Sequence, residues 1–115
     1  SFLPLDPVFP EKFNSMSRRV VVTGIGTLNP LAHNATEYWQ ALLAGKSGIA
    51  PITLFDTKDH KVHFAGEVKN FEPTKWIEPK ETRHLDRFAQ FAMAASKEAI
   101  TESGIDFSKE DPFRC

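Results

Sequence analysis

The stretch RRVVVTGIGTLNPLA, residues 18–32, runs from two arginines through three valines into a pair of glycines. Three consecutive β-branched residues, Val20 to Val22, predict a strand that is buried on both faces of a parallel sheet. Gly24 and Gly26 end this strand, and Pro30 disfavours helix at the residue before it. The stretch therefore predicts an α/β fold that begins with a central strand.

The glycine pair allows two interpretations. A dinucleotide-binding loop needs G-x-G-x-x-G directly before a helix, but the third glycine position is Asn29 and the next helix is expected only near Ala35. A nucleotide-binding oxidoreductase is therefore the disfavoured alternative. The favoured interpretation is a tight strand exit, at which a backbone without side chains passes close to a crowded neighbour.

Three further segments have local signals for secondary structure. Asn34, with Glu37 three positions later, predicts the N-terminus of a helix, and Gly45 predicts its end. This helix would carry one apolar stripe, formed by Tyr38, Trp39, Leu42 and Leu43. Residues 46–61 are expected to be irregular, and the alternation over residues 62–68 predicts a short exposed strand. Pro73 and Pro79 bracket an expected turn of helix around Trp76.

The longest periodic segment predicts one helix from Lys80 to Ser103, ended by Gly104. Its expected buried face consists of Leu85, Phe88, Ala92, Ala95 and Ala99. One central strand cannot cover two amphipathic helices. The α/β sheet is therefore expected to be incomplete in this chain.

Composition limits the classes of function. The formal net charge is -1, and no apolar run approaches the length of a membrane-spanning helix, so neither nucleic acid nor a membrane is an expected partner. A single cysteine, Cys115, excludes an internal disulfide framework and fits a cytoplasmic protein. Residues 1–15 contain three prolines and are interpreted as a flexible leader, left over from cloning or extending upstream of a natural start at Met16. Residues 16–115 are expected to form the folded part.

The segments RRVVVTGIG, NP, EYWQALLAGKSGI, ITLFD, FAGEVKNF, KETRHLDRFAQFA and EAITESGI follow one another in a specific order and spacing. From Arg18 to about Phe107 the chain resembles the N-terminal portion of a β-ketoacyl-acyl-carrier-protein synthase II-type condensing enzyme. Asn29 departs from the usual Ser or Thr of that family, and Ala32 from a usual glycine.

The resemblance implies the first part of a thiolase-like fold, a layered αβαβα sandwich, in an enzyme that is usually a homodimer. It also implies an acyltransferase that performs a decarboxylative Claisen condensation with malonyl-acyl-carrier protein, without a cofactor or metal. The family's catalytic cysteine and two histidines are expected outside this chain. Cys115 does not match those motifs, and neither do the four histidines: His33, His60, His63 and His84. The histidines are expected to be surface residues. We therefore expect the chain alone to be inactive; the alternative is a non-catalytic fragment that docks a carrier protein or a partner.

Four basic residues open the expected long helix at spacings of 3, 1 and 3, which would place them on one side: Lys80, Arg83, His84 and Arg87. In related synthases, basic residues at the positions of Lys80 and Arg83, and a lysine at that of His84, help to bind the acidic acyl carrier protein. The resemblance thus predicts a carrier-docking surface. The alternative is a solvated helix face with weak local ion pairs.

Overall fold

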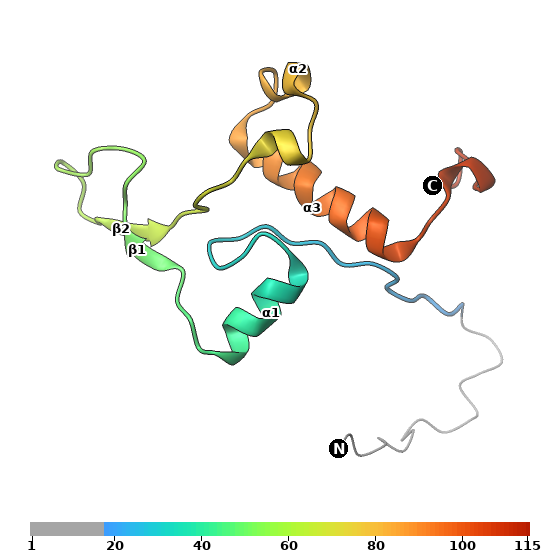
Figure 1. Ribbon diagram of the computed structural model, residues 1–115, viewed down its shortest axis with the longest axis horizontal. Helices are drawn as coiled ribbons and strands as arrows, with labels where there is room; N and C mark the ends of the chain where they lie inside the picture. The colour runs from blue at the N-terminus through green and yellow to red at the C-terminus, as the bar shows by residue number, and fades with distance from the viewer. Residues whose placement is uncertain (1–17) are drawn as a thin grey trace, which may run out of the picture.

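The computed structural model describes residues 18–115 (Figure 1). Its elements follow in the order α1 (Ala35–Leu43), β1 (Ile49–Pro51), β2 (Phe64–Gly66), η2 (Pro73–Lys75), α2 (Pro79–Thr82), α3 (Arg87–Ser103) and η3 (Phe107–Lys109), where η denotes a 3₁₀ helix. The expected leader at residues 1–15 and the start at Met16 lie outside the described residues. The α/β class is confirmed, with a small sheet.

The strand predicted at Val20 to Val22 is not present. These residues lie in a segment without regular secondary structure, and the exposed fractions of Val20 and Val22 are 92% and 80%. A strand requires a neighbour that accepts and donates its backbone hydrogen bonds. Within residues 18–115 the only sheet pairs β1 with β2, so the valines have no such neighbour and the prediction of burial is wrong.

Gly24 and Gly26 lie against the backbone of α3, which the segment follows in Figure 1. A Cβ atom at Gly24 would collide with the carbonyl oxygen of Ala99 and lie 2.9 Å from the Cβ of Ser103. A Cβ at Gly26 would collide with the carbonyl oxygen of Ala95. The interpretation of the glycine pair as a close backbone approach is therefore confirmed.

Helix α1 begins and ends at the predicted residues. The Asn34 Oδ1 atom accepts a hydrogen bond from the Glu37 amide at 2.8 Å, which satisfies one of the free N–H groups of the first turn. At the other end, Gly45 has a φ of 65°, and the amides of Gly45 and Lys46 donate to the carbonyls of Leu42 and Ala41. This is the Schellman arrangement, which requires a residue that tolerates positive φ.

Strands β1 and β2 form an antiparallel pair in which Ala50 faces Ala65. The strand predicted over residues 62–68 is confirmed in its central part, whereas β1 lies in a span that was expected to be irregular. Beyond β2, Glu67 is only 8% exposed. Its carboxylate accepts hydrogen bonds from the Thr53 amide and the Thr53 hydroxyl, both at 2.8 Å, so it fastens the segment after β1 to the segment after β2.

The single long helix predicted from Lys80 to Ser103 is wrong. The structure has α2 and α3 at different orientations, separated by a turn at residues 83–86 (Figure 1). Gly104 does end α3, with a φ of 66°. The predicted buried face is also partly wrong, because Ala94 is the buried residue of α3 and Phe88 is 73% exposed.

A carboxylate on α3 joins two other parts of the chain. Glu98 Oε2 accepts a hydrogen bond from the Thr27 amide at 2.9 Å, and its Oε1 accepts one from the Ala35 amide at 2.7 Å. Ala35 is the first residue of α1, where backbone N–H groups lack partners inside the helix. Glu98 therefore fixes the start of α1 and the glycine segment to α3.

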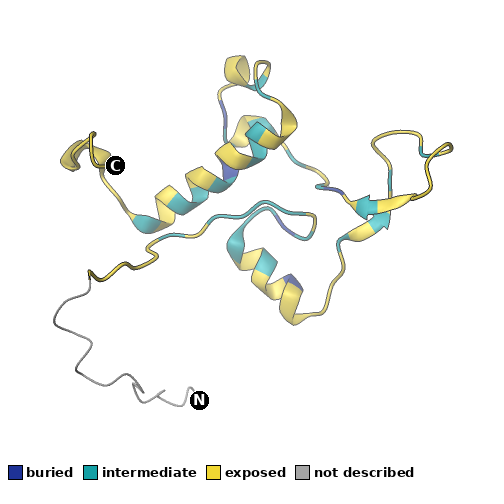
Figure 2. Ribbon diagram, turned by 180° about the vertical axis from the view of Figure 1, so that it is seen from behind, coloured by how far each residue is buried: buried dark blue, intermediate teal, exposed yellow. Residues whose placement is uncertain are grey.

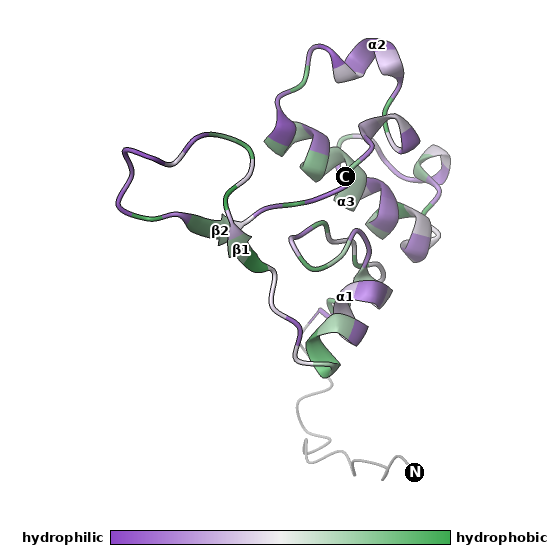
Figure 3. Cartoon of the chain, turned by 60° about the vertical axis from the view of Figure 1, so that its left-hand side comes forward, coloured by the Kyte–Doolittle hydropathy of each residue, from purple (hydrophilic) through white to green (hydrophobic). Residues whose placement is uncertain are grey.

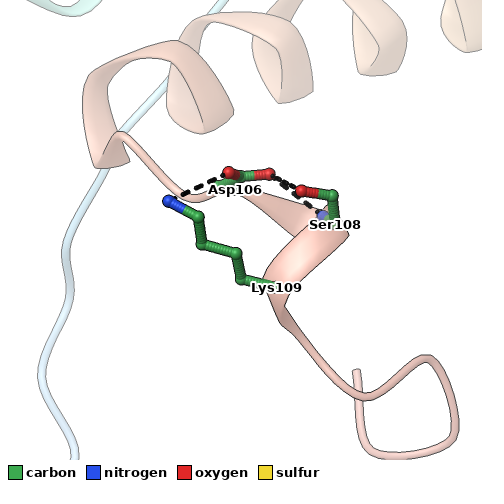
Figure 4. Close-up of polar contacts among 3 residues, drawn as sticks. All are labelled: Asp106, Ser108 and Lys109. Atoms are coloured by element: carbon green, nitrogen blue, oxygen red, sulfur yellow. Dashed lines mark hydrogen bonds and ion pairs between the residues drawn. The ribbon is translucent and has the colours of Figure 1, made fainter.

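The chain after α3 is held by local polar contacts (Figure 4). Asp106 Oδ1 accepts hydrogen bonds from the Ser108 hydroxyl at 2.6 Å and from the Ser108 amide at 3.1 Å. Lys109 Nζ lies 3.4 Å from Asp106 Oδ2. The Ser108 hydroxyl bond, followed by the Ser108 amide and by Lys109, lowers the pKa of Asp106 below its ordinary value. These contacts define η3.

Apolar burial is slight, and most of the ribbon in Figure 2 has the colour of exposed residues. The buried apolar residues of the described chain are Ala32, Ala41, Ile77 and Ala94. The predicted apolar stripe of α1 stays largely open, because Trp39, Leu42 and Leu43 are exposed. Apolar residues also colour the C-terminal half of α1 and the strands in Figure 3. The radius of gyration is 19.8 Å, against about 13 Å for a compact chain of this length.

Candidate functional site

The four predicted docking residues surround the junction between α2 and α3. Lys80 belongs to α2, Arg83 is its C-cap, His84 lies in the following turn, and Arg87 opens α3. All four are exposed. Because the helix is broken between them, their expected place on one side of one helix is wrong. They instead lie along the segment that runs from α2 through the turn into α3. Residues 80–87 are called the basic turn below.

Lys80 and Arg83 are unpaired within the described part of the chain. The ion pairs between residues 18 and 115 join Lys75 with Glu72 and Lys109 with Asp106, both outside the basic turn. The local ion pairs expected for a merely solvated face are therefore not formed by these residues. The two side chains are free to meet a charged partner.

Arg87 has contacts that the other three lack. Its Nη2 atom donates to the Val68 carbonyl at 2.8 Å, and its guanidinium carbon lies 5.1 Å from the centre of the Phe91 ring. A planar guanidinium can make both contacts at once, whereas an ammonium group cannot reproduce the stacking. Arg87 thus connects the segment after β2 with α3.

Aromatic rings continue this contact across the molecule. The Phe91 ring meets the Phe71 ring edge-on at 5.1 Å, and Phe71 in turn meets His33 at 6.2 Å. His33 Nε2 lies 2.7 Å from the Lys69 carbonyl. His33 is half-buried, less exposed than His60, His63 and His84.

The other candidate side chains stay dispersed. His60, His63 and Cys115 are exposed, and His63 Nδ1 lies 2.9 Å from the Thr57 hydroxyl. Residues 18–115 contain no group of three side chains suited to bind a metal ion. None of the helices described here is long and apolar enough to cross a membrane.

Charges of both signs alternate around the basic turn. Its cations are Lys80, Arg83 and Arg87, and the nearby carboxylates are Glu78, Glu81 and Asp86. These formal charges cancel only when Glu78, which precedes the turn, is included, so the binding of an acidic partner depends on the direction in which each side chain projects. Beside the turn lies a hollow of about 320 Å³, lined by Glu81, His84, Leu85 and Met93.

Gln90 was not selected from the sequence, although it contacts the basic turn directly. Its side-chain Nε2 donates to the carbonyls of Thr82 and Leu85, each at 3.2 Å. These carbonyls lie on either side of Arg83 and His84. A glutamine early in a helix is too common to attract notice, and the sequence signal that could have revealed this role is Asp86, a frequent N-cap residue that marks the helix break.

A solved structure has the same arrangement of chain. The ishigamide ketosynthase/chain length factor superposes on this chain with a TM-score of 0.72 and 38% sequence identity, covering 79% of this chain and 23% of that chain. The expected fold class, the N-terminal part of a thiolase-like fold, is therefore confirmed.

The family follows from the sequence match. The protein-family model described as "Beta-ketoacyl synthase, N-terminal domain" matches residues 17–114. The chain therefore belongs to this family. It is 44% identical over 92 residues to 3-oxoacyl-[acyl-carrier-protein] synthase 2 of Synechocystis sp., covering 80% of this chain. The same-named protein of Staphylococcus aureus (strain COL) is 41% identical over 95 residues, covering 83%. The chain spans about a fifth of the length of these relatives, 22% and 23%.

Proposed function

We propose that this chain forms the opening part of a 3-oxoacyl-[acyl-carrier-protein] synthase, an acyltransferase of fatty acid elongation. The family match and the names of its relatives support this assignment. In the proposed reaction, malonyl-acyl-carrier protein loses carbon dioxide and its enolate carbon attacks an acyl thioester held on a cysteine. The new carbon–carbon bond forms as the cysteine thiolate leaves.

The nucleophile and the two histidines of this reaction are assigned to parts of the enzyme other than residues 18–115. The exposed valines and the open stripe of α1 suit this arrangement, because such surfaces are covered inside a layered fold. We expect the complete enzyme to be a cytoplasmic homodimer.

Residues 18–115 contribute recognition of the acidic carrier protein through the basic turn. The observation that supports this role is the exposure of Lys80 and Arg83 outside any ion pair of the described residues. An approaching carboxylate therefore does not have to displace an internal one. Such contacts between exposed charges are individually weak and depend on ionic strength.

The test is Arg83→Glu in the complete synthase. We expect the dissociation constant for the acyl carrier protein to rise roughly 3- to 10-fold at low salt, since an attraction is replaced by a repulsion, and to rise less as salt is added. Isothermal titration calorimetry measures both conditions.

Lys75→Glu is the matched control, because it reverses an exposed charge outside the basic turn that already pairs with Glu72 at 3.3 Å. This variant should bind the carrier as the unmodified enzyme does. An Arg83→Glu enzyme with unchanged affinity at low salt would exclude docking at the basic turn.

A further inference from the structure

The basic turn is fixed from outside by one amide side chain. Gln90 is half-buried in the first turns of α3, and its backbone N–H donates to the Asp86 carbonyl at 3.0 Å. Its side-chain Nε2 reaches back to the carbonyls of Thr82 and Leu85. One residue thus joins the beginning of α3 to both ends of the segment that contains Arg83 and His84.

The turn has few other means of holding its shape. Helix α2 contains four residues, far fewer than an isolated helix needs to be stable. Within the turn, the His84 amide donates to the Glu81 carbonyl at 3.0 Å, the Leu85 amide approaches the Thr82 carbonyl only at 3.5 Å, and the Asp86 side chain does not cap α3. The two hydrogen bonds from Gln90, each at 3.2 Å, add a restraint from α3 that reaches both Thr82 and Leu85.

We propose that Gln90 is a positioning residue for carrier recognition, which holds the basic turn so that Arg83 and His84 project toward the partner. This proposal rests on the proposed function of the turn. It follows from the mixed charges of residues 78–87: because this segment carries three cations and three carboxylates, it attracts an acidic surface best when its cations are held forward of its carboxylates. Gln90 supplies no charge of its own and acts through the backbone.

The test is Gln90→Met in the complete synthase, which keeps the length and helix propensity of the side chain but removes the N–H donors. We expect the dissociation constant for the acyl carrier protein to rise roughly 3- to 10-fold, as for the loss of a hydrogen-bonded restraint. Gln90→Asn is the second variant: it keeps the amide, is one methylene shorter, and should fail to reach the two carbonyls.

Thr101→Val is the matched control. It removes another hydrogen bond from an α3 side chain to a backbone carbonyl, that of Thr101 Oγ1 to Lys97 at 2.8 Å, away from the turn. It should leave carrier binding unchanged.

Two measurements separate positioning from general destabilisation. A plot of log Kd against log salt concentration should have the same slope for Gln90→Met as for the unmodified enzyme, because no charge is lost. The slope should be smaller for Arg83→Gln, which loses one charge. Hydrogen exchange of the His84 and Leu85 amides should accelerate in Gln90→Met but not in Thr101→Val. Weaker carrier binding together with faster exchange at these amides supports the proposal.

Two outcomes overturn it. If Gln90→Met and Gln90→Asn bind the carrier normally while Arg83→Glu does not, the turn docks the carrier but Gln90 does not position it. If Gln90→Met does not change the hydrogen exchange of the His84 and Leu85 amides, Gln90 does not hold the turn. Normal binding by Arg83→Glu refutes the proposed docking function instead, and the exchange result still decides whether Gln90 holds the turn.

Discussion

Gly24 and Gly26 are required by the backbone of α3 and not by a ligand. Their missing Cβ atoms leave the space that the carbonyl oxygens of Ala99 and Ala95 occupy. The sequence alone could identify the close approach, because the third glycine of a dinucleotide loop is absent. It could not identify the neighbour, since α3 lies far along the chain.

Gly26→Ala should therefore be strongly destabilising. The new methyl group would meet backbone atoms of Ala95, which cannot turn aside as a side chain can, and we expect a loss of about 3 kcal/mol or more in unfolding free energy. Gly104→Ala is the control, because its Cβ would enter open space and only the positive φ opposes it, at about 1–2 kcal/mol. Urea unfolding of the intact protein compares them; equal losses would contradict the packing argument.

The buried carboxylate of Glu67 gives a pH-dependent prediction. Hydrogen bonds from the Thr53 hydroxyl and amide lower the pKa of Glu67 below its ordinary value of 4.5. A lowered pKa in the folded state stabilises the protein above pH 4.5, and this contribution disappears as the pH falls through the lowered pKa.

Thr53→Val removes the hydroxyl bond and should reduce this contribution. The difference in unfolding free energy between the two proteins should be largest above pH 4.5 and shrink in more acidic solution. Denaturant unfolding at a series of pH values measures the difference. A difference that stays constant with pH would show that the hydroxyl affects packing and not ionisation.

At the scale of the elements, Glu98 of α3 connects α3 with both the glycine segment and the start of α1. Its two carboxylate oxygens accept bonds from Thr27 and Ala35, one on the glycine segment and one at the start of α1. Asn34 and Glu98 thus satisfy different N–H groups at the same helix end. The cap was predictable from adjacent residues, whereas the carboxylate acts over 63 positions.

Glu98→Gln should lower the unfolding free energy by about 1–2 kcal/mol, because one charged acceptor is replaced by an N–H group facing a backbone donor. Glu98→Ala should cost more, since both backbone donors lose their partner. Glu110→Gln is the control for the charge change, on an exposed glutamate after α3. Thermal unfolding ranks the three variants, and equal stability of Glu98→Gln and the unmodified protein would refute the connection.

The ends of elements were predicted more successfully than their faces. Asn34, Gly45 and Gly104 act through their own conformations and nearest neighbours, so the sequence predicts them directly. The break between α2 and α3 contains neither proline nor glycine, and periodicity alone therefore continued one helix through it. Because of this break, Leu85 lies outside any helix, and the basic residues do not share one side of one helix.

For the whole molecule, the family and the fold class could be predicted from the order of short segments spread over most of the chain. The exposure of Val20 to Val22 could not be predicted, because a run of valines indicates only that a strand is possible. Whether it forms depends on a partner strand, and β1 and β2 pair with each other instead. The predicted shortage of sheet agrees with the exposed apolar residues and the extended dimensions.

The contact between the glycine segment and α3 also orders events during synthesis. Thr27 and Glu98 are 71 positions apart, so a ribosome adding 5–20 residues per second needs roughly 4 to 14 s between them. Throughout this interval the nascent glycine segment has no helix on which to lie. Chaperones that capture unfinished apolar segments would find their earliest opportunity there, before the last turn of α3 has been translated.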